Sequence, residues 1–129
     1  IIKALLVRVG DEIYAIPLNS VREVVELPSN TIKTFGNRVF ISLRGELMPF
    51  IRLHNILDIE NPVLQENMTV VIVKKGDKLS GLLVDSLIGQ QDIVIKSLGR
   101  YLANIDILSG ATILGDGSIA IILDINNIA

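Results

Sequence analysis

The chain has 129 residues, of which 50% are hydrophobic, and carries a formal net charge of -2 at pH 7. These values are typical of one globular domain with a sizeable core. The absence of cysteine excludes disulfides, thiolate catalysis and sulfur-ligated metals, and fits a reducing cytoplasm. The weak negative charge and the few aromatic residues argue against a nucleic-acid partner.

The chain starts with Ile rather than Met, and apolar residues follow at once. We therefore expect it to be a piece of a longer polypeptide. It contains neither a signal-peptide pattern nor an apolar run of about 18 residues, so we expect neither export nor direct membrane insertion.

Short runs rich in Ile, Val and Leu alternate with short polar segments that contain Gly, Asp or Asn along the whole chain. This pattern predicts an all-β fold of about ten short strands. The expected strands cover residues 5–9, 13–17, 24–27, 38–43, 47–53, 70–74, 79–85, 92–96, 107–114 and 119–123. Helices are expected to be few and short, at residues 18–21, 54–58 and 98–102.

Four glycine-containing turns, at Gly10, Gly45, Gly76 and Gly117, predict hairpins, because glycine adopts positive φ without a steric clash. Their order repeats, so the chain reads as two similar halves. Closing each half into a small barrel would remove unpaired strand edges. We expect a first barrel at about 1–64 and a second at about 65–129, with strands that can be exchanged between them and a shared core.

The chemistry-bearing residues give no catalytic constellation. His54 is the sole histidine, and we interpret it as the surface-exposed start of a short helix. The glycine spacing at residues 110–115 resembles a phosphate loop, but Asp116 and Gly117 stand where that loop needs Lys and Ser or Thr. Lys96 is interpreted as a solvated strand end. We expect no catalytic residue, no metal and no cofactor.

The acidic residues follow no calcium-binding pattern. Asp11, Asp77 and Asp116 are expected to serve turns. Asp85 and Asp124 each follow an apolar strand, and we expect them to cap backbone amides.

Five stretches together resemble the CheW-like domain over essentially the whole chain. They are residues 14–18 (YAIPL) followed by Val21, and residues 43–49 (LRGELMP), 81–85 (GLLVD), 89–96 (GQQDIVIK) and 110–117 (GATILGDG). The last two stretches are closer to the version at the C-terminal end of the chemotaxis histidine kinase CheA than to the free adaptor CheW.

The resemblance implies two intertwined five-stranded SH3-like barrels. It also implies a non-catalytic regulatory domain of a two-component chemotaxis kinase, coupled to CheW and to the cytoplasmic tips of chemoreceptors. The kinase domains would lie upstream in the same chain. The location would be the cytoplasm, at the inner face of the membrane within receptor arrays.

The resemblance further implies protein contacts but no catalytic, cofactor or metal site. Receptor-facing or groove contacts are expected at Val21, Glu23, Val39 and Arg44. Arg44 could equally be only the first residue of a tight turn, and Val21 could be core. Exposed apolar residues of the first barrel, such as Ile41 and Met48, are candidates for contacts between neighbouring modules in a ring.

Two alternatives stay open. The first is a free-standing CheW-type adaptor, or an adaptor fused to a receiver domain. The second, from another class, is a small-ligand-binding β-barrel protein or hydrolase with a ligand in a cleft between barrels.

Overall fold

The computed structural model describes residues 1–60, 65–96 and 108–128, and these residues are mostly strand. The strands are β1 (Ile2–Val9), β2 (Glu12–Pro17), β3 (Val21–Pro28), β4 (Ile32–Phe35), β5 (Arg38–Leu43), β6 (Glu46–Arg52), β7 (Asn67–Lys75), β8 (Lys78–Val84), β9 (Ser86–Ile93), β10 (Leu108–Ile113) and β11 (Ile119–Leu123). The helical turns are η1 (Leu18–Ser20), η2 (Ser29–Thr31), α1 (Leu53–Ile56) and α2 (Ile125–Ile128).

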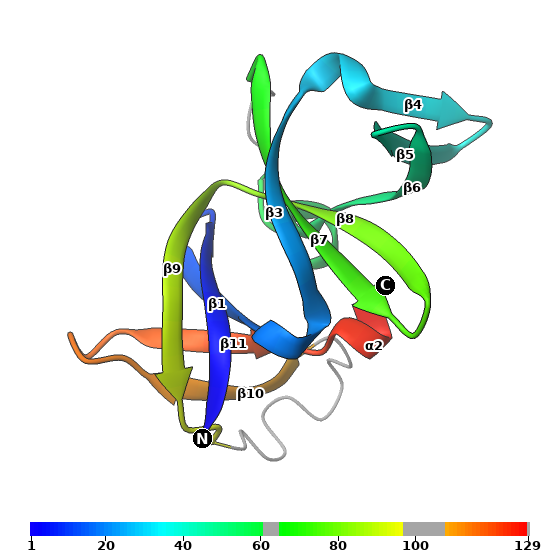
Figure 1. The fold of residues 1–129 in the computed structure, drawn as a ribbon. Helices are drawn as coiled ribbons and strands as arrows, with labels where there is room; N and C mark the ends of the chain where they lie inside the picture. The colour runs from blue at the N-terminus through cyan, green and yellow to red at the C-terminus, as the bar shows by residue number, and fades with distance from the viewer. Residues whose placement is uncertain (61–64, 97–107, 129) are drawn as a thin grey trace.

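Within the described residues the strands form two strongly curved sheets that lie side by side (Figure 1). Sheet A has the order β10-β11-β2-β1-β9. Sheet B has the order β3-β7-β8-β6-β5-β4. The predicted all-β class is confirmed.

The two sheets exchange strands between the early and the late part of the chain. In sheet A, the β1–β2 hairpin lies between β9 and the β10–β11 hairpin. In sheet B, the β7–β8 hairpin lies between β3 and the β5–β6 hairpin. Parallel pairing joins β11 to β2 and β6 to β8. The sheets therefore do not divide the chain at residue 64, because each hairpin covers its edges with strands from the other half.

The expected shared core is present between the sheets. One buried cluster combines side chains of sheet A, such as Val7 and Ile16, with side chains of sheet B, such as Val71 and Leu82. Leu53 of α1 and Ile125 of α2 belong to the same cluster. Two smaller clusters lie inside sheet B and inside sheet A. Strand β7 is buried on both faces at residues 70–73, as its unbroken aliphatic run predicts.

Several predicted boundaries change. The sequence pattern misses β4, which has only four residues and is mostly exposed. It also misses the first part of β9, whose side chains are largely polar or exposed because β9 is an edge strand. The helices expected at 18–21 and 54–58 correspond to η1 and α1. The helix expected at 98–102 lies outside the described residues.

Candidate protein interface

Arg44 occupies a tight turn between β5 and β6. Its φ is 49° and that of Gly45 is 81°, and Leu43 pairs with Glu46 across the hairpin. Two consecutive positive φ values are what a two-residue hairpin turn requires. The turn brings the Arg44 guanidinium towards β3, where its Nη2 donates to Oε2 of Glu23 at 2.5 Å. Arg44 is thus both a turn residue and the partner of Glu23.

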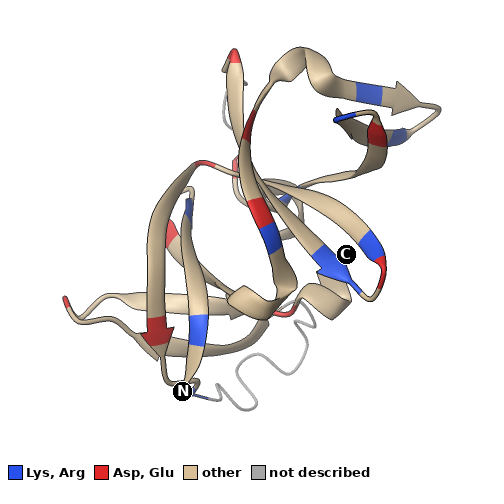
Figure 2. Ribbon diagram, viewed as in Figure 1, with Lys and Arg blue, Asp and Glu red and all other residues tan. Residues whose placement is uncertain are grey.

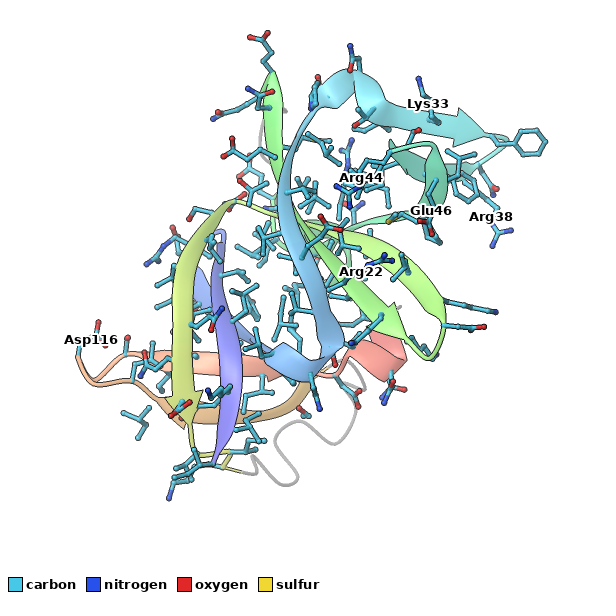
Figure 3. The ribbon with its side chains drawn as sticks, in the orientation of Figure 1. Arg22, Lys33, Arg38, Arg44, Glu46 and Asp116 are labelled. Atoms are coloured by element: carbon cyan, nitrogen blue, oxygen red, sulfur yellow. The ribbon has the colours of Figure 1, made fainter. Side chains whose placement is uncertain are left out.

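The Glu23–Arg44 pair lies at a recess of about 170 Å³ between β3 and the β5–β6 hairpin. Arg22 and Glu46 also line this recess, and Figure 3 shows both near Arg44. The side chains of Arg44 and Glu23 are 64% and 29% exposed, so water screens their attraction. Such a pair stabilises a fold by only ~0–1 kcal/mol. Because both side chains are partly exposed, their charges remain accessible to another molecule.

The two valines expected at this site lie in different surroundings. Val21 is the first residue of β3, is half-buried, and packs against the shared core. Val39 lies in β5 opposite Thr34 of β4 and is 36% exposed. Val21 therefore contributes to packing beside the recess, whereas Val39 faces the surface of the β4–β5 hairpin.

The expectation that Ile41 and Met48 are exposed is wrong. They are 0% and 3% exposed, they pair across β5 and β6, and both belong to the core of sheet B. Successive side chains of a strand point to opposite faces. The neighbours of Met48, Leu47 and Pro49, are therefore exposed, Leu47 at 63%.

Two exposed apolar surfaces lie at opposite ends of the molecule. The sheet B surface consists of the exposed residues Phe35 and Leu47, which lie on the same face of the sheet as Lys33 and Arg38, whereas Val39 lies on the opposite face. Figure 3 shows these two cations at one end and Asp116 at the other.

The sheet A surface consists of Ile113, Ile119 and Ile121 around an apolar groove of about 320 Å³, with Lys96 at its border. Ile113 and Ile119 are 70% and 56% exposed. Sequence reasoning missed this surface and Phe35, because β11 is an unbroken aliphatic run and no polar alternation marks Ile119 and Ile121 as outward-facing.

Among the residues that the structure describes, charges of both signs lie on both sheets (Figure 2). Among the residues that the structure describes, no three His, Asp or Glu side chains come together as a metal site. Within the same residues, no helix is both long and apolar enough to cross a membrane.

His54 is not at the surface, contrary to the sequence-based expectation. It is 1% exposed, and its Nε2 lies 2.9 Å from Oδ1 of Asp85. The other carboxylate oxygen of Asp85 accepts a hydrogen bond from the Gly10 N–H at 2.6 Å. The predicted backbone-capping role of Asp85 is therefore confirmed. Asp124 likewise accepts from the Asn126 N–H at 3.1 Å.

The false phosphate loop is a strand and a turn, as expected, because β10 ends at Ile113 and the chain turns at Asp116 and Gly117. Hydrogen bonds from the hydroxyl and the backbone N–H of Ser118 lower the pKa of Asp116. Burial raises the pKa of Tyr14 above its usual value, and the Glu12 carboxylate adds to this shift. These shifts belong to a turn and to a core residue.

Comparison with known proteins identifies the family. The family model described as CheW-like domain matches residues 3–129. The chain is 42% identical over 127 residues to the chemotaxis protein CheA of Bacillus subtilis (strain 168), which covers 98% of this chain and 19% of that protein. It is 44% identical over 127 residues to the sensor histidine kinase CheAY of Helicobacter pylori (strain ATCC 700392 / 26695), which covers 97% of this chain and 16% of the kinase.

The chain thus spans less than a fifth of the length of these curated relatives. The fold is also that of a solved scaffolding protein, TtCheW from Thermoanaerobacter tengcongensis. The TM-score is 0.79 at 22% sequence identity, and the superposition covers 95% of this chain and 88% of that one. The family model and the identity to the CheA relatives show that this chain belongs to the CheW-like domain family.

Proposed function

We propose that this chain is a non-catalytic regulatory and scaffolding domain of a CheA-type chemotaxis kinase, which couples the kinase to CheW and to chemoreceptor tips. The observation that carries the proposal is the match of nearly the whole chain to 16–19% of the length of the CheA relatives. Catalysis and phosphotransfer would then belong to the remaining part of the kinase. The domain would work in the cytoplasm, beneath the membrane that holds the receptors.

The surroundings of the reactive groups support a non-catalytic role. His54 is buried against Asp85, so its imidazole is not accessible to a nucleotide or to a phosphoryl group. Asp116 and Asp124 are engaged in hydrogen bonds with their own turns. These side chains therefore have structural partners rather than an open site in which a reaction could occur.

The two exposed apolar surfaces support a scaffolding role. Burial of apolar area contributes about 25 cal/mol per Å² before the costs of association. The sheet B surface and the sheet A surface differ from each other and lie at opposite ends, so each would contact a different face of a neighbouring module. Such head-to-tail contacts form a ring when the rotation between modules closes.

The Glu23–Arg44 recess supports the receptor contact. Its charges are held at fixed positions by a strand and a tight turn, and they remain partly exposed. A receptor helix could replace part of the solvent there and exchange hydrogen bonds with Arg44, while Val21 packs beneath. Val39 does not line the recess, but it lies on the same face of β5 as Leu43, which does.

Calorimetry of the chain with a purified CheW adaptor tests the proposal. Leu47→Glu and Ile113→Glu each place a charge in one apolar surface, and we expect at least about tenfold weaker binding for one or both. Leu87→Glu, at an exposed apolar position of β9, is the matched control and should bind as the unchanged chain does. The melting temperature should stay the same for all three variants.

Absence of binding by the unchanged chain at tens of micromolar would contradict the coupling role. Equal weakening by the control variant would instead argue against the two surfaces as the docking sites. A free adaptor would bind through the same fold, but the curated relatives reported above are CheA proteins, and they favour the kinase-attached domain.

A further inference from the structure

Asp85 is the single residue between β8 of sheet B and β9 of sheet A. Figure 1 shows the chain crossing there directly from one sheet to the other. Its backbone N–H donates to the Arg8 carbonyl in β1 at 2.9 Å. Its Oδ2 accepts from the N–H of Gly10 in the β1–β2 turn, at 2.6 Å. Two of its hydrogen bonds therefore fix this crossover to sheet A.

The third hydrogen bond reaches the segment that leaves sheet B. The Nε2 of His54 in α1, directly after β6, lies 2.9 Å from Oδ1 of Asp85. In the tautomer with the proton on Nε2, this nitrogen donates to the carboxylate. The Nδ1 atom is buried and has no hydrogen-bond partner among the residues that the structure describes. Asp85 is thus the polar contact that holds the imidazole in this orientation.

Apolar packing supports the same junction. The N–H of Ile59 donates to the His54 carbonyl at 2.8 Å, so the chain turns back after α1. A Cβ atom on Gly10 would lie 2.9 Å from Cγ2 of Ile59, which leaves no room for a larger residue in that turn. Gly10 also has a φ of 61°, which favours glycine. The β1–β2 turn and the α1 segment therefore pack directly against each other.

The other described crossover between the sheets lacks a comparable acidic side chain. Strand β2 of sheet A leads into β3 of sheet B through η1, which contains no acidic residue and has no side-chain capping bond. The helix α2, which follows β11 as α1 follows β6, has Asn126 where α1 has His54. The side-chain hydrogen bonds at Asp85 are therefore found in the β8–β9 connection and not in the β2–β3 connection.

We propose that Asp85 is a positioning residue that sets the orientation of sheet A relative to sheet B, with His54 as its anchor on the sheet B side. One carboxylate satisfies donors from both sides at the point where the chain passes between sheets. Loss of the bond to His54 leaves a buried donor unpaired, which is costly in a low-dielectric interior, whereas the Gly10 N–H is in a more exposed position. The consequence that this orientation sets the spacing of the two docking surfaces rests on the proposed function, whereas the positioning role does not.

Spin-label distance measurements on the 129-residue chain test the positioning role directly. The sequence has no cysteine, so introduced labels are unambiguous. Gln91→Cys in β9 and Lys33→Cys in β4 report the distance between the sheets, since both side chains are exposed. Gln91→Cys with Ile113→Cys in β10 reports a distance within sheet A.

Two substitutions separate the contribution of Asp85 from that of His54. Asp85→Asn leaves one acceptor oxygen in place of two, so the side chain cannot accept from Gly10 and His54 together. His54→Gln retains a nitrogen donor and is the conservative variant for the anchor. Asp124→Asn is the matched control, because Asp124 also accepts from a backbone N–H but only within its own turn.

We expect Asp85→Asn to shift or broaden the distance distribution between the sheets while the distribution within sheet A is unchanged. His54→Gln should give a smaller change, and Asp124→Asn none. In the unchanged chain the ¹⁵N signals of the sole imidazole should show a proton on Nε2, and Asp85→Asn should move them. These readouts are independent of any partner, so they separate this proposal from the docking function.

An unchanged distance between the sheets in Asp85→Asn would overturn the proposal, even if the melting temperature falls. Equal broadening within sheet A and between the sheets would overturn it as well, because that result means general loosening. Should Asp85→Asn fail to fold, the same comparison is made with His54→Gln, whose unaltered distribution would equally exclude a positioning junction.

Discussion

Sheet A and sheet B are built from equivalent elements but differ at one edge. In each sheet a hairpin from one part of the chain is joined in parallel to a second hairpin from the other part. Sheet B continues beyond β5 with β4, whereas among the described strands β10 is an edge of sheet A, extended only by a bridge between Lys96 and Ala111. The same topology can therefore present different surfaces.

The sheets also differ in their interior. Phe50 lies opposite Gly81 where β6 meets β8, and Ile122 lies opposite Ala15 where β11 meets β2. Glycine leaves room for the core of sheet B, because a Cβ at Gly81 would lie 2.5 Å from Cδ1 of Ile41 and this side chain would have to shift. The duplicated layout fixes where the strands run, but the local side chains decide how closely they approach.

The strongest test of this difference compares Ile41 with Ile113, which lie in the equivalent strands β5 and β10. Ile41→Ala removes a fully buried side chain from sheet B and should lower the free energy of unfolding by about 2–5 kcal/mol. Ile113→Ala should change it by less than about 0.5 kcal/mol, because that side chain is 70% exposed. Urea unfolding measures both changes in free energy. Similar losses for the two variants would contradict the assignment of Ile41 to the core and of Ile113 to the surface.

The next test exchanges the small residues of the two interiors. Gly81→Ala should destabilise the chain by about 1–3 kcal/mol, because the new methyl group overpacks against Ile41 and Val70. The matched change Ala15→Gly should cost about 0.5–1 kcal/mol through backbone entropy, and the loss of a fully buried methyl group adds to that cost. Thermal unfolding measures the loss of stability of each variant. A stabilising Gly81→Ala would show that the core of sheet B can accommodate an additional methyl group.

A smaller effect is expected for the Glu23–Arg44 pair of sheet B, which has no counterpart among the described residues of sheet A. A double-mutant cycle with Glu23→Gln and Arg44→Gln should give a coupling energy below about 1 kcal/mol that weakens with added salt. If receptor binding falls while this coupling remains small, the charges serve recognition. A coupling of several kcal/mol would instead assign the pair to the fold.

The smallest expected effect is a pH dependence of the free energy of unfolding that comes from Tyr14 in sheet A. The equivalent position in sheet B is Ser80. The folded pKa of Tyr14 is raised above the ordinary value of 10.0, so the unfolded chain loses this proton first. The unfolded state then binds fewer protons, and stability falls as the pH rises above about 10. Urea titrations below and above that pH should show this fall, and Tyr14→Phe should remove its share.

Much of the fold could be predicted from the sequence, because aliphatic runs and glycine turns are local signals. The strand expected at residues 70–74 is present, and the Gly10 and Gly76 turns join hairpins. Which strands pair across the sheets is a non-local property. The parallel contact between β11 and β2 leaves no mark in either strand alone.

The candidate site could be predicted only in part. Glu23 and Arg44 come together, although no local pattern connects residues that far apart. Met48 was assigned to the surface and Leu47 was not, because a one-residue shift reverses the face of a strand and both residues are apolar. The capping role of Asp85 follows from its place after a strand, but its bond to His54 depends on the tertiary packing of α1.

The exchange of strands has a consequence for how the protein is made. The β1–β2 hairpin leaves the ribosome before the rest of this domain, yet β2 receives its parallel neighbour only when β11, late in the domain, has been synthesised. Until then an aliphatic edge stays open to other nascent chains, for a time on the order of seconds. We therefore expect dependence on chaperones during synthesis to concentrate on this early hairpin.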